Sequence, residues 1–246
     1  MAYTNLGTPP RGSVIYPAWN PGFIKVVDQA LSKAWHDLVD NDASVLETKD
    51  EDIITDCLLN NLTNLRRRSE IPGFNDAFFS LPSRDAKLPD CDGYSIDQMP
   101  DITIRLAKCR SGIADDRHDA LFFECKVLDP SRGLDSYRVD GIDRFLSGRY
   151  AWRMPHAGML AYVFDRRDTA PTNALITYSK RKNKGITIAK HLRLVGLPTK
   201  VVCASTPLVS EIAMTEHERL APVVDGKTFA ISLRHMWLMP PAGPTL

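Results

Sequence analysis

The chain has 246 residues, of which 43% are hydrophobic and 25% are charged, so it is long enough and apolar enough to bury the core of a globular domain. It lacks the long apolar run of a membrane span and the basic-then-apolar start of a signal peptide, so we expect a cytoplasmic protein. Five widely spaced cysteines without a C-x-x-C pair argue against a disulfide framework or a zinc knuckle and indicate reduced thiols.

The first part of the chain predicts an extended arm and two helices. Residues 1–22 are rich in Pro and Gly and show little periodicity, so we expect an arm outside a single domain that covers residues 23–246. Apolar residues at helical spacing predict a first helix from Phe23 to Val39. A second helix is predicted from Thr48 to about Arg66, with Thr48 and Glu51 forming a capping box.

The middle of the chain predicts a β-hairpin. Residues 100–106 and 121–127 are rich in β-branched and aromatic residues, and a polar loop joins them. The second segment is an almost unbroken apolar run, which is typical of a central strand that is covered on both faces. An earlier segment, Phe78–Leu81, fits either another strand of this sheet or a packed turn.

Three charged residues of the predicted hairpin form a candidate metal site. Glu124 and Lys126 share one face of their strand because side chains alternate along it. We expect Asp101 roughly opposite Lys126, on the same face. A solvated surface ion pair is the alternative, and it would contribute little to stability. In a covered strand, however, charges are costly unless a partner or a metal compensates them, which favours the metal site.

These residues resemble the signature of a known superfamily. Pro100–Asp101 followed by Glu124–Cys125–Lys126 is similar to the motif of the PD-(D/E)xK nucleases, which have the restriction-endonuclease-like fold. Residues 137–150 and 157–163 resemble the helix and the following strand of members found in bacterial defence systems. The resemblance covers about residues 48–164. It implies an α/β fold with an αβββαβ core, in which helices flank a mixed central sheet, and with elaborations at the N-terminus and over residues 165–246.

The chemistry of the motif suggests a role for each residue. Asp101, Glu124 and the backbone carbonyl of Cys125 offer hard oxygen ligands that suit Mg²⁺ or Mn²⁺. A bound metal lowers the pKa of a water molecule and stabilises developing charge. The resemblance implies that Lys126 orients or deprotonates the attacking water, or pairs with the phosphate.

A fourth site residue is expected on the second helix. Members of the superfamily often carry a metal-linked glutamate on their first core helix, and Glu51 is the position that matches, with Asp52 and Glu47 as alternatives. The capping box gives Glu51 a purely structural role as a further alternative.

The rest of the chain predicts more helices and strands. We expect a helix over residues 137–150, a strand over 159–164, a helix over 173–182, and late strands over 201–204 and 229–238. His217 and Arg219 precede the last of these strands, which carries His235. A histidine that is hydrogen-bonded within the core is the favoured interpretation of His235.

Basic residues gather in the second half of the chain. Residues 1–130 carry 14 Lys and Arg against 21 Asp and Glu, whereas residues 131–246 carry 17 against 9, although the net charge is only +1. Clusters of this kind contact phosphates, and a solvated helix face is the alternative. The residues expected to bind nucleic acid are Lys180, Arg181, Lys182, Lys184, Arg144 and Arg149.

Together these features predict a magnesium-dependent endonuclease that cleaves DNA in a bacterial defence context. The alternative is a catalytically silent or partner-activated subunit that binds nucleic acid in a multi-protein complex. No G-x-x-x-x-G-K-[ST] sequence occurs, so an NTP-driven step would need a helicase or ATPase partner. A second copy of the chain is another partner to consider. No G-x-S-x-G sequence occurs, and the cysteines lie mostly in apolar segments, which argues against a serine or cysteine hydrolase.

Overall fold

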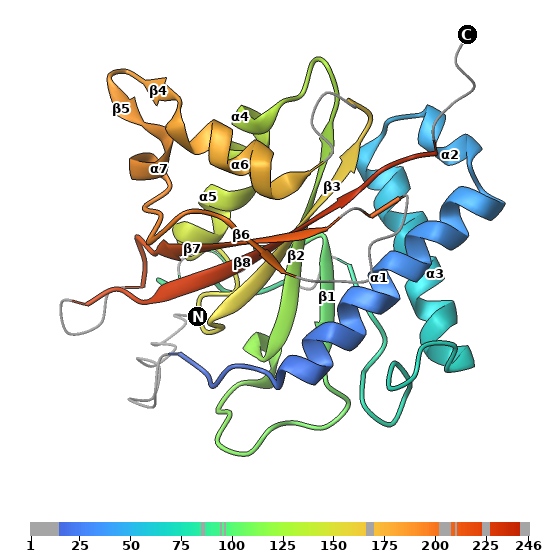
Figure 1. Cartoon of the computed structure of the whole chain (residues 1–246). Helices are drawn as coiled ribbons and strands as arrows, with labels where there is room; N and C mark the ends of the chain where they lie inside the picture. The colour runs from blue at the N-terminus through green and yellow to red at the C-terminus, as the bar shows by residue number, and fades with distance from the viewer. Residues whose placement is uncertain are drawn as a thin grey trace, which may run out of the picture.

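A mixed sheet of six strands organises the computed structural model of the chain (Figure 1). The structure describes residues 15–84, 87–93, 95, 97–165, 170–201, 208–209, 211–222 and 227–241. In spatial order the strands are β1 (Ile102–Arg105), β2 (Ala120–Leu128), β3 (His156–Val163), β8 (Ala230–Leu238), β7 (Ile212–Glu218) and β6 (Thr199–Val201). The three central strands β2, β3 and β8 are parallel to one another, and the outer neighbours pair antiparallel.

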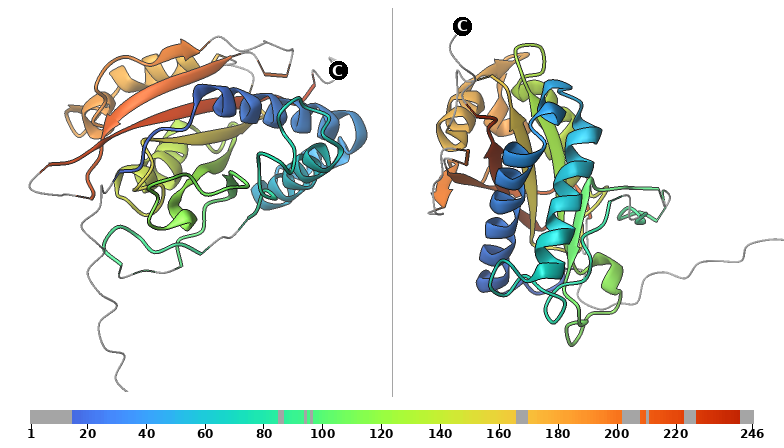
Figure 2. Two further views of the ribbon diagram at one scale, coloured as in Figure 1. Left: turned by 90° about the horizontal axis from the view of Figure 1, so that it is seen from below. Right: turned by 90° about the vertical axis from the view of Figure 1, so that its right-hand side faces the viewer.

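The central strand β2 is buried along its whole length, as the apolar run predicts. One face of the sheet is covered by α1 (Pro21–Asn41) and α3 (Glu51–Arg68), which lie side by side (Figure 2, right). The Trp35 ring of α1 stacks on Tyr162 of β3, and the Thr55 hydroxyl of α3 lies 2.9 Å from the Tyr162 hydroxyl. A short helix, α2 (Ser44–Glu47), joins α1 to α3. These contacts fix α3 against the middle of the sheet.

Shorter helical segments cover the other face. After β2 the chain forms α4 (Leu134–Tyr137), a π-helical turn η2 (Arg138–Ile142) and α5 (Asp143–Leu146). We expected one helix over residues 137–150, but the observed helix starts earlier, contains the wide turn and ends sooner. A Cβ atom on Gly141 would lie 2.4 Å from Met159 Cε and 3.7 Å from Glu124 Cγ, so a larger residue here would require the end of the Met159 side chain to move.

The remaining elements follow β3. Helix α6 (Pro171–Lys180) leads into a small hairpin of β4 (Lys182–Asn183) and β5 (Ile186–Thr187), and α7 (Ile188–His191) comes next. A 3-10 turn, η1 (Asp116–His118), lies in the loop between β1 and β2. Within the described ranges no helix combines the length and the apolar character needed to cross a membrane.

The α/β class and the mixed sheet flanked by helices are confirmed, whereas the local predictions are confirmed only in part. For Phe78–Leu81 the turn, one of the two expected alternatives, is observed: residues 76–78 form a turn, and only isolated bridges pair Phe79 with Leu106 and Ser83 with Thr103. Strand β7 is not among the expected elements, although buried and exposed residues alternate in its second half. The last expected strand is present as β8. Of the strand expected over 201–204, only Val201 is described, as the last residue of β6, and residues 202–204 lie outside the described part.

The N-terminal arm is described only from residue 15. Residues 15–20 have no regular structure, and Tyr16 and Trp19 are buried against the body of the protein. Of the five cysteines, Cys203 lies outside the described residues, and the four that are described, Cys57, Cys91, Cys109 and Cys125, are unpaired. Burial raises the pKa of the Cys125 thiol, in keeping with an inert side chain.

Candidate active site at the edge of β2

The candidate site lies where β2 runs past the end of β1. Pairing with β1 stops at Ile102 opposite Phe123, so the next part of β2 has an uncovered edge. Two carboxylates take the place of the missing strand: the backbone N–H of Cys125 donates to Asp101 at 2.7 Å, and that of Val127 donates to Glu51 at 3.2 Å. These bonds satisfy buried backbone donors that would otherwise be costly. The backbone N–H groups at this uncovered edge therefore hold the side chains of Asp101 and Glu51 against β2.

The register differs from the prediction. Continuing the observed pairing by one residue places Asp101 level with Glu124, two residues from the expected position opposite Lys126. Both registers put Asp101 on the same face as Glu124 and Lys126, because alternation has a period of two residues. The sequence pattern could therefore predict the face but not the register.

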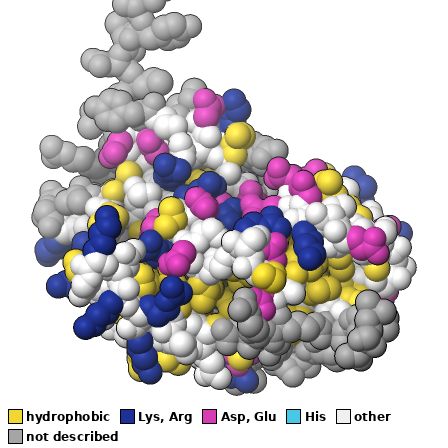
Figure 3. Space-filling view, turned by 90° about the horizontal axis from the view of Figure 1, so that it is seen from above, with side chains coloured by type: hydrophobic (Ala, Val, Ile, Leu, Met, Phe, Trp, Pro, Cys, Tyr) yellow, Lys and Arg dark blue, Asp and Glu magenta, His cyan; other side chains and the backbone are white. Residues whose placement is uncertain are grey.

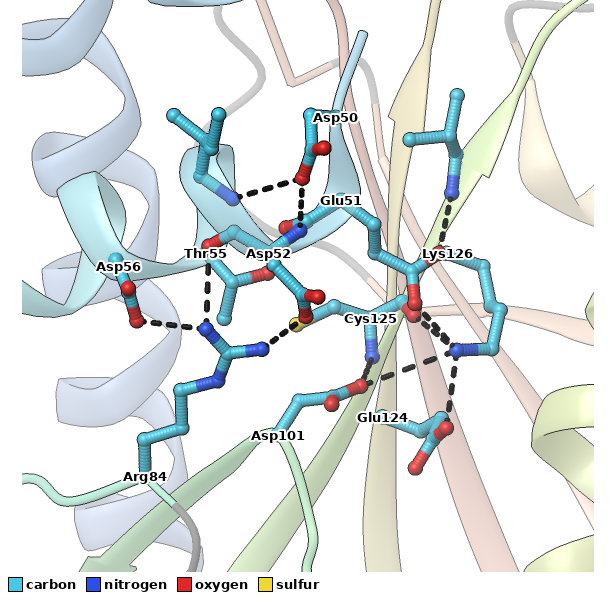
Figure 4. A network of polar contacts seen from close by, with 12 residues as sticks. Asp50, Glu51, Asp52, Thr55, Asp56, Arg84, Asp101, Glu124, Cys125 and Lys126 are labelled. Carbon is cyan, nitrogen blue, oxygen red and sulfur yellow. Dashed lines mark hydrogen bonds and ion pairs between the residues drawn. The ribbon is translucent and has the colours of Figure 1, made fainter.

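The Lys126 ammonium is the centre of the site (Figure 4). Its Nζ donates to Glu51 Oε1 at 2.7 Å, to the Cys125 carbonyl at 2.6 Å and lies 3.0 Å from Glu124 Oε1. Asp101 Oδ2 is 4.0 Å away. Burial disfavours the charged amine, but the nearby carboxylates, Glu124 foremost, outweigh this effect and raise the pKa of Lys126. The residue is therefore an ammonium at neutral pH.

Glu51 reaches the site because another residue caps the helix. Asp50 is the N-cap of α3, and its carboxylate accepts from the backbone N–H groups of Asp52 and Ile53 at 2.9 and 3.1 Å. The predicted capping box of Thr48 and Glu51 is therefore wrong, and Glu51 is available to contact Lys126. As the first residue of α3, Glu51 also lies at the positive end of the helix dipole, which favours its charge.

The two alternatives to Glu51 lie elsewhere. Asp52 pairs with Arg84, which also contacts Asp56 at 2.7 Å (Figure 4). Glu47 is an exposed residue of α2. Of the three acids considered, Glu51 is the one that contacts Lys126.

Glu124 is the most enclosed acid of the site, with no exposed side-chain surface. Its carboxylate accepts from Arg144 at 2.6 Å and from the Tyr150 hydroxyl, and it forms an ion pair with Lys126 at 3.0 Å. Burial, followed by repulsion from Asp101, raises the pKa of Glu124 to about 7, although Lys126 and Arg144 oppose this shift. Burial also raises the pKa of Asp101. The ionised forms of Glu124 and Asp101 are therefore less favourable in this structure than they would be in water.

The sequence did not identify Tyr150 as a site residue. Its place depends on the turn after α5, where Gly148 has a φ of 74° and the Arg149 backbone N–H donates to the Arg144 carbonyl at 3.1 Å. No residue pattern marks such a turn as part of a site. Arg144 was expected to contact nucleic acid, but in this structure it lies on Glu124. We refer to Glu51, Asp101, Glu124, Lys126 and Arg144 as the β2-edge cluster.

Four of the other expected nucleic-acid residues lie outside this cluster, on α6 and the hairpin that follows it. Lys180 ends α6, and Arg181, Lys182 and Lys184 continue into the β4–β5 hairpin. Figure 3 views the molecule from above, and Lys and Arg side chains gather at the left of this view. The hairpin lies on the same side in Figure 1. Arg181 lies over the Tyr178 ring and 3.6 Å from Asp135, and Arg149 is exposed after α5. The basic residues of α6 and the hairpin thus gather on one side of the molecule, whereas the backbone N–H of Arg149 is bonded to Arg144 of the β2-edge cluster.

The donor chemistry of the β2-edge cluster fits a hard divalent cation, but its arrangement is closed. Carboxylate oxygens of Glu51, Asp101 and Glu124 and the Cys125 carbonyl face one point, and these are ligands that Mg²⁺ accepts. At that point lies the Lys126 ammonium. Accordingly, among the described residues no group of three or more Asp, Glu, His or Cys side chains is arranged to hold an ion directly. A metal at Glu124 would require at least one of the two cations on this carboxylate, Lys126 or Arg144, to move.

A second buried network involves the histidines of β7 and β8. His217 Nδ1 lies 2.7 Å from the Leu192 carbonyl, and its Nε2 lies 2.7 Å from the Thr215 hydroxyl. The same hydroxyl lies 2.7 Å from Nε2 of His235, whose Nδ1 is 2.9 Å from the Tyr137 hydroxyl. The prediction of a hydrogen-bonded core role for His235 is confirmed. We call this network the histidine chain.

Comparisons with known proteins do not extend this description. No protein-family model, no curated protein and no solved structure matches the chain. The geometry therefore defines an α/β protein with a mixed six-stranded sheet and a buried cluster of acids and bases at the edge of its central strand.

Proposed function

We propose that this protein is a divalent-metal-dependent nuclease with a restriction-endonuclease-like core, and that DNA is its substrate. One observation carries the proposal: Asp101, Glu124 and Lys126 meet Glu51 at the uncovered edge of β2. These are the four side chains that the resemblance to PD-(D/E)xK nucleases implies. The antiparallel pair β1–β2, followed by a helical segment and the parallel strand β3, also supports it.

The charge balance of the β2-edge cluster favours a cation followed by a phosphate. With all groups ionised, three carboxylates and the two cations Lys126 and Arg144 sum to a net charge of −1. A divalent cation would change this to +1, and a phosphodiester would then neutralise it. Because the site has low solvent access, such compensation is worth more than it would be in water.

The residues of the cluster have distinct tasks in this proposal. Asp101, Glu124 and the Cys125 carbonyl would hold the cation, and Glu51 would keep Lys126 oriented. A bound divalent cation lowers the pKa of a water molecule and offsets charge on the phosphate. Lys126, as an ammonium with a raised pKa, would donate to a phosphate oxygen or to the departing alkoxide rather than act as the base.

A second candidate function is favoured by the closed arrangement of the cluster. Lys126 and Arg144 already neutralise Glu124, which suits a subunit that is silent until a partner opens the site. A helicase or ATPase in a bacterial defence complex is the partner that the resemblance suggests. Cleavage that appears only after such a partner is added would favour this function over an independent nuclease.

The direct test is a cleavage assay on single- and double-stranded DNA and RNA with Mg²⁺ or Mn²⁺. We expect cleavage of DNA that a chelator abolishes, and a loss of about a hundredfold or more in Asp101→Asn, Glu124→Gln and Lys126→Met. Glu216→Gln, which removes an exposed carboxylate of β7, is the matched control and should cleave like the unchanged protein. Undiminished cleavage in all three site variants would contradict the proposal.

A comparison of two adjacent acids tests the role of Glu51. Glu51→Gln weakens the contacts to Lys126 and Val127, whereas Asp52→Asn weakens only the pair with Arg84. We expect the first substitution to lower the cleavage rate by at least about tenfold more than the second. Equal effects would remove Glu51 from the site.

A further inference from the structure

The Glu124 carboxylate is closed by three donors. Its Oε1 lies 2.6 Å from Arg144 and 3.0 Å from Lys126, and its Oε2 accepts from the Tyr150 hydroxyl. The side chain has no exposed surface that would let solvent or an ion approach directly. A cation could therefore bind this carboxylate only after one of the donors has moved.

Arg144 is the donor best able to move. Its side chain is 32% exposed, against 10% for Lys126, and Tyr150 is 2% exposed. Lys126 is also bonded to Glu51 and to the Cys125 carbonyl, so it stays in place when Glu124 is taken away. Arg144 belongs to the short helix α5 and not to the sheet, so its guanidinium can turn towards solvent without disturbing a strand.

A phosphate offers Arg144 an alternative partner. A guanidinium binds carboxylate and phosphate in the same planar, two-bond geometry, and both interactions are charge-assisted. A backbone phosphate that approaches the partly exposed face of Arg144 would therefore compete directly with Glu124. When Arg144 turns to the phosphate, Oε1 of Glu124 loses its nearest donor and becomes more accessible to a cation.

We propose that Arg144 is a positioning residue that makes divalent-cation binding at Glu124 depend on the presence of a nucleic-acid phosphate. The inference rests on the proposed nuclease function, since it takes Glu124 to be a metal ligand. Because coupling between two ligands is reciprocal, the cation must strengthen nucleic-acid binding by the same factor. Coupling of this kind typically amounts to between about 5-fold and 150-fold in affinity.

The test measures Mn²⁺ binding rather than cleavage. Electron paramagnetic resonance reports free Mn²⁺ during titration of the full chain at about pH 8, with and without a phosphorothioate DNA duplex that keeps its charge but resists hydrolysis. We expect the duplex to tighten Mn²⁺ binding by about tenfold in the unchanged protein. Arg144→Gln should bind Mn²⁺ about tenfold more tightly without DNA, and the duplex should then change its affinity by less than about twofold.

Three further variants keep the result interpretable. Arg117→Gln is the matched control, because it removes an exposed arginine that pairs with a carboxylate, Asp115, at 2.8 Å outside the cluster, and it should behave like the unchanged protein. Tyr150→Phe removes another donor to Glu124 and should tighten Mn²⁺ binding while the duplex effect is retained. Arg144→Lys carries the test if Arg144→Gln does not fold, and its duplex effect should be smaller than that of the unchanged protein.

The outcomes separate the inference from the function on which it rests. Equal Mn²⁺ affinity and an equal duplex effect in the unchanged protein and Arg144→Gln would overturn the role of Arg144 and leave the nuclease proposal standing. If neither protein binds Mn²⁺, with or without the duplex, the nuclease proposal fails, and the inference fails with it.

Discussion

The two buried polar networks, the β2-edge cluster and the histidine chain, compensate their buried polar groups in different ways. The β2-edge cluster keeps ionised groups in the interior and balances them against one another, whereas the histidine chain contains no formal charge. Because the Leu192 carbonyl can only accept, His217 Nδ1 must donate to it, and His217 Nε2 must accept from Thr215. Thr215 then accepts from His235 Nε2, which leaves His235 Nδ1 to accept from Tyr137. Every group has one role, provided that both rings are neutral.

The difference indicates which network is built to change. In the histidine chain each donor meets an acceptor, and no ligand is needed to complete it. In the β2-edge cluster, burial raises the pKa of Glu124 to about 7 and also raises that of Asp101, so these acids are not fully stabilised by the protein alone. An added cation would stabilise the ionised acids of the β2-edge cluster. The histidine chain, in which each donor already meets an acceptor, would gain no stability from it. Perturbed acids of this type are a feature of functional sites.

The largest expected effect comes from removing the central cation. Lys126→Met leaves the carboxylates of Glu51, Asp101 and Glu124 without their common partner, and loss of one member of a buried ion pair costs about 3–5 kcal/mol in the free energy of unfolding. Millimolar Mg²⁺ should restore much of this loss, because a ligand that binds only the folded state stabilises it. Chemical denaturation at about pH 8 with and without Mg²⁺ measures both effects.

The matched variant in the other network is Thr215→Val. It removes the hydroxyl that joins His217 and His235. The free energy of unfolding should fall by about 1–3 kcal/mol, because the Nε2 atom of each ring then lacks its partner. Mg²⁺ should not restore this stability. A similar recovery by Mg²⁺ in Thr215→Val and Lys126→Met would erase the proposed difference between the networks.

The next effect is a dependence of stability on pH from the histidine chain. Burial lowers the pKa of His217 to about 4 and that of His235 to about 3, so the folded protein binds fewer protons than the unfolded chain below the usual histidine pKa of 6.5. The stabilisation is present above pH 6.5 and is lost as the pH falls towards these lower values. Between about pH 7 and pH 5, each ring should cost about 2 kcal/mol in the free energy of unfolding.

The substitution His217→Gln isolates this contribution. Glutamine does not titrate, so the free energy of unfolding of the variant should fall by about 2 kcal/mol less over this pH interval than that of the unchanged protein. Parallel pH profiles for the unchanged protein and His217→Gln would show that the chain does not depend on neutral rings.

The smallest effect is expected at the basic surface. Replacing Lys180, Lys182 and Lys184 by Gln should weaken DNA binding and make its salt dependence less steep by about 0.9 for each phosphate contact that is lost. Lys25→Gln, an exposed lysine of α1, should leave the slope unchanged. Fluorescence anisotropy at several salt concentrations gives the slopes. An unchanged slope in the triple variant would remove this surface from nucleic-acid binding.

The sequence predicted what depends on local patterns. The apolar run of β2, the helical spacing of α1 and the face shared by Glu124 and Lys126 follow from side-chain periodicity, and all three are observed. The register of β1 against β2 does not follow, since a shift by two residues preserves the face of every side chain.

Other features depend on contacts between distant segments. Asp50 and Thr48 are both good N-caps, and only the fold selects Asp50 and so makes Glu51 available to Lys126. The contact of Tyr150 with Glu124 requires the wide turn of η2 and the turn after α5, which no short pattern encodes. For these reasons the acids of the site could be predicted, but not the donors that close it.

The most direct test of the central claim is to locate a cation in a crystal of the protein with Mn²⁺ and a DNA duplex. The proposal predicts an anomalous peak between the carboxylates of Asp101 and Glu124 and the Cys125 carbonyl, with Arg144 turned away from Glu124. A Mn²⁺ peak elsewhere, with Lys126 and Arg144 still bound to Glu124 as they are here, would contradict it.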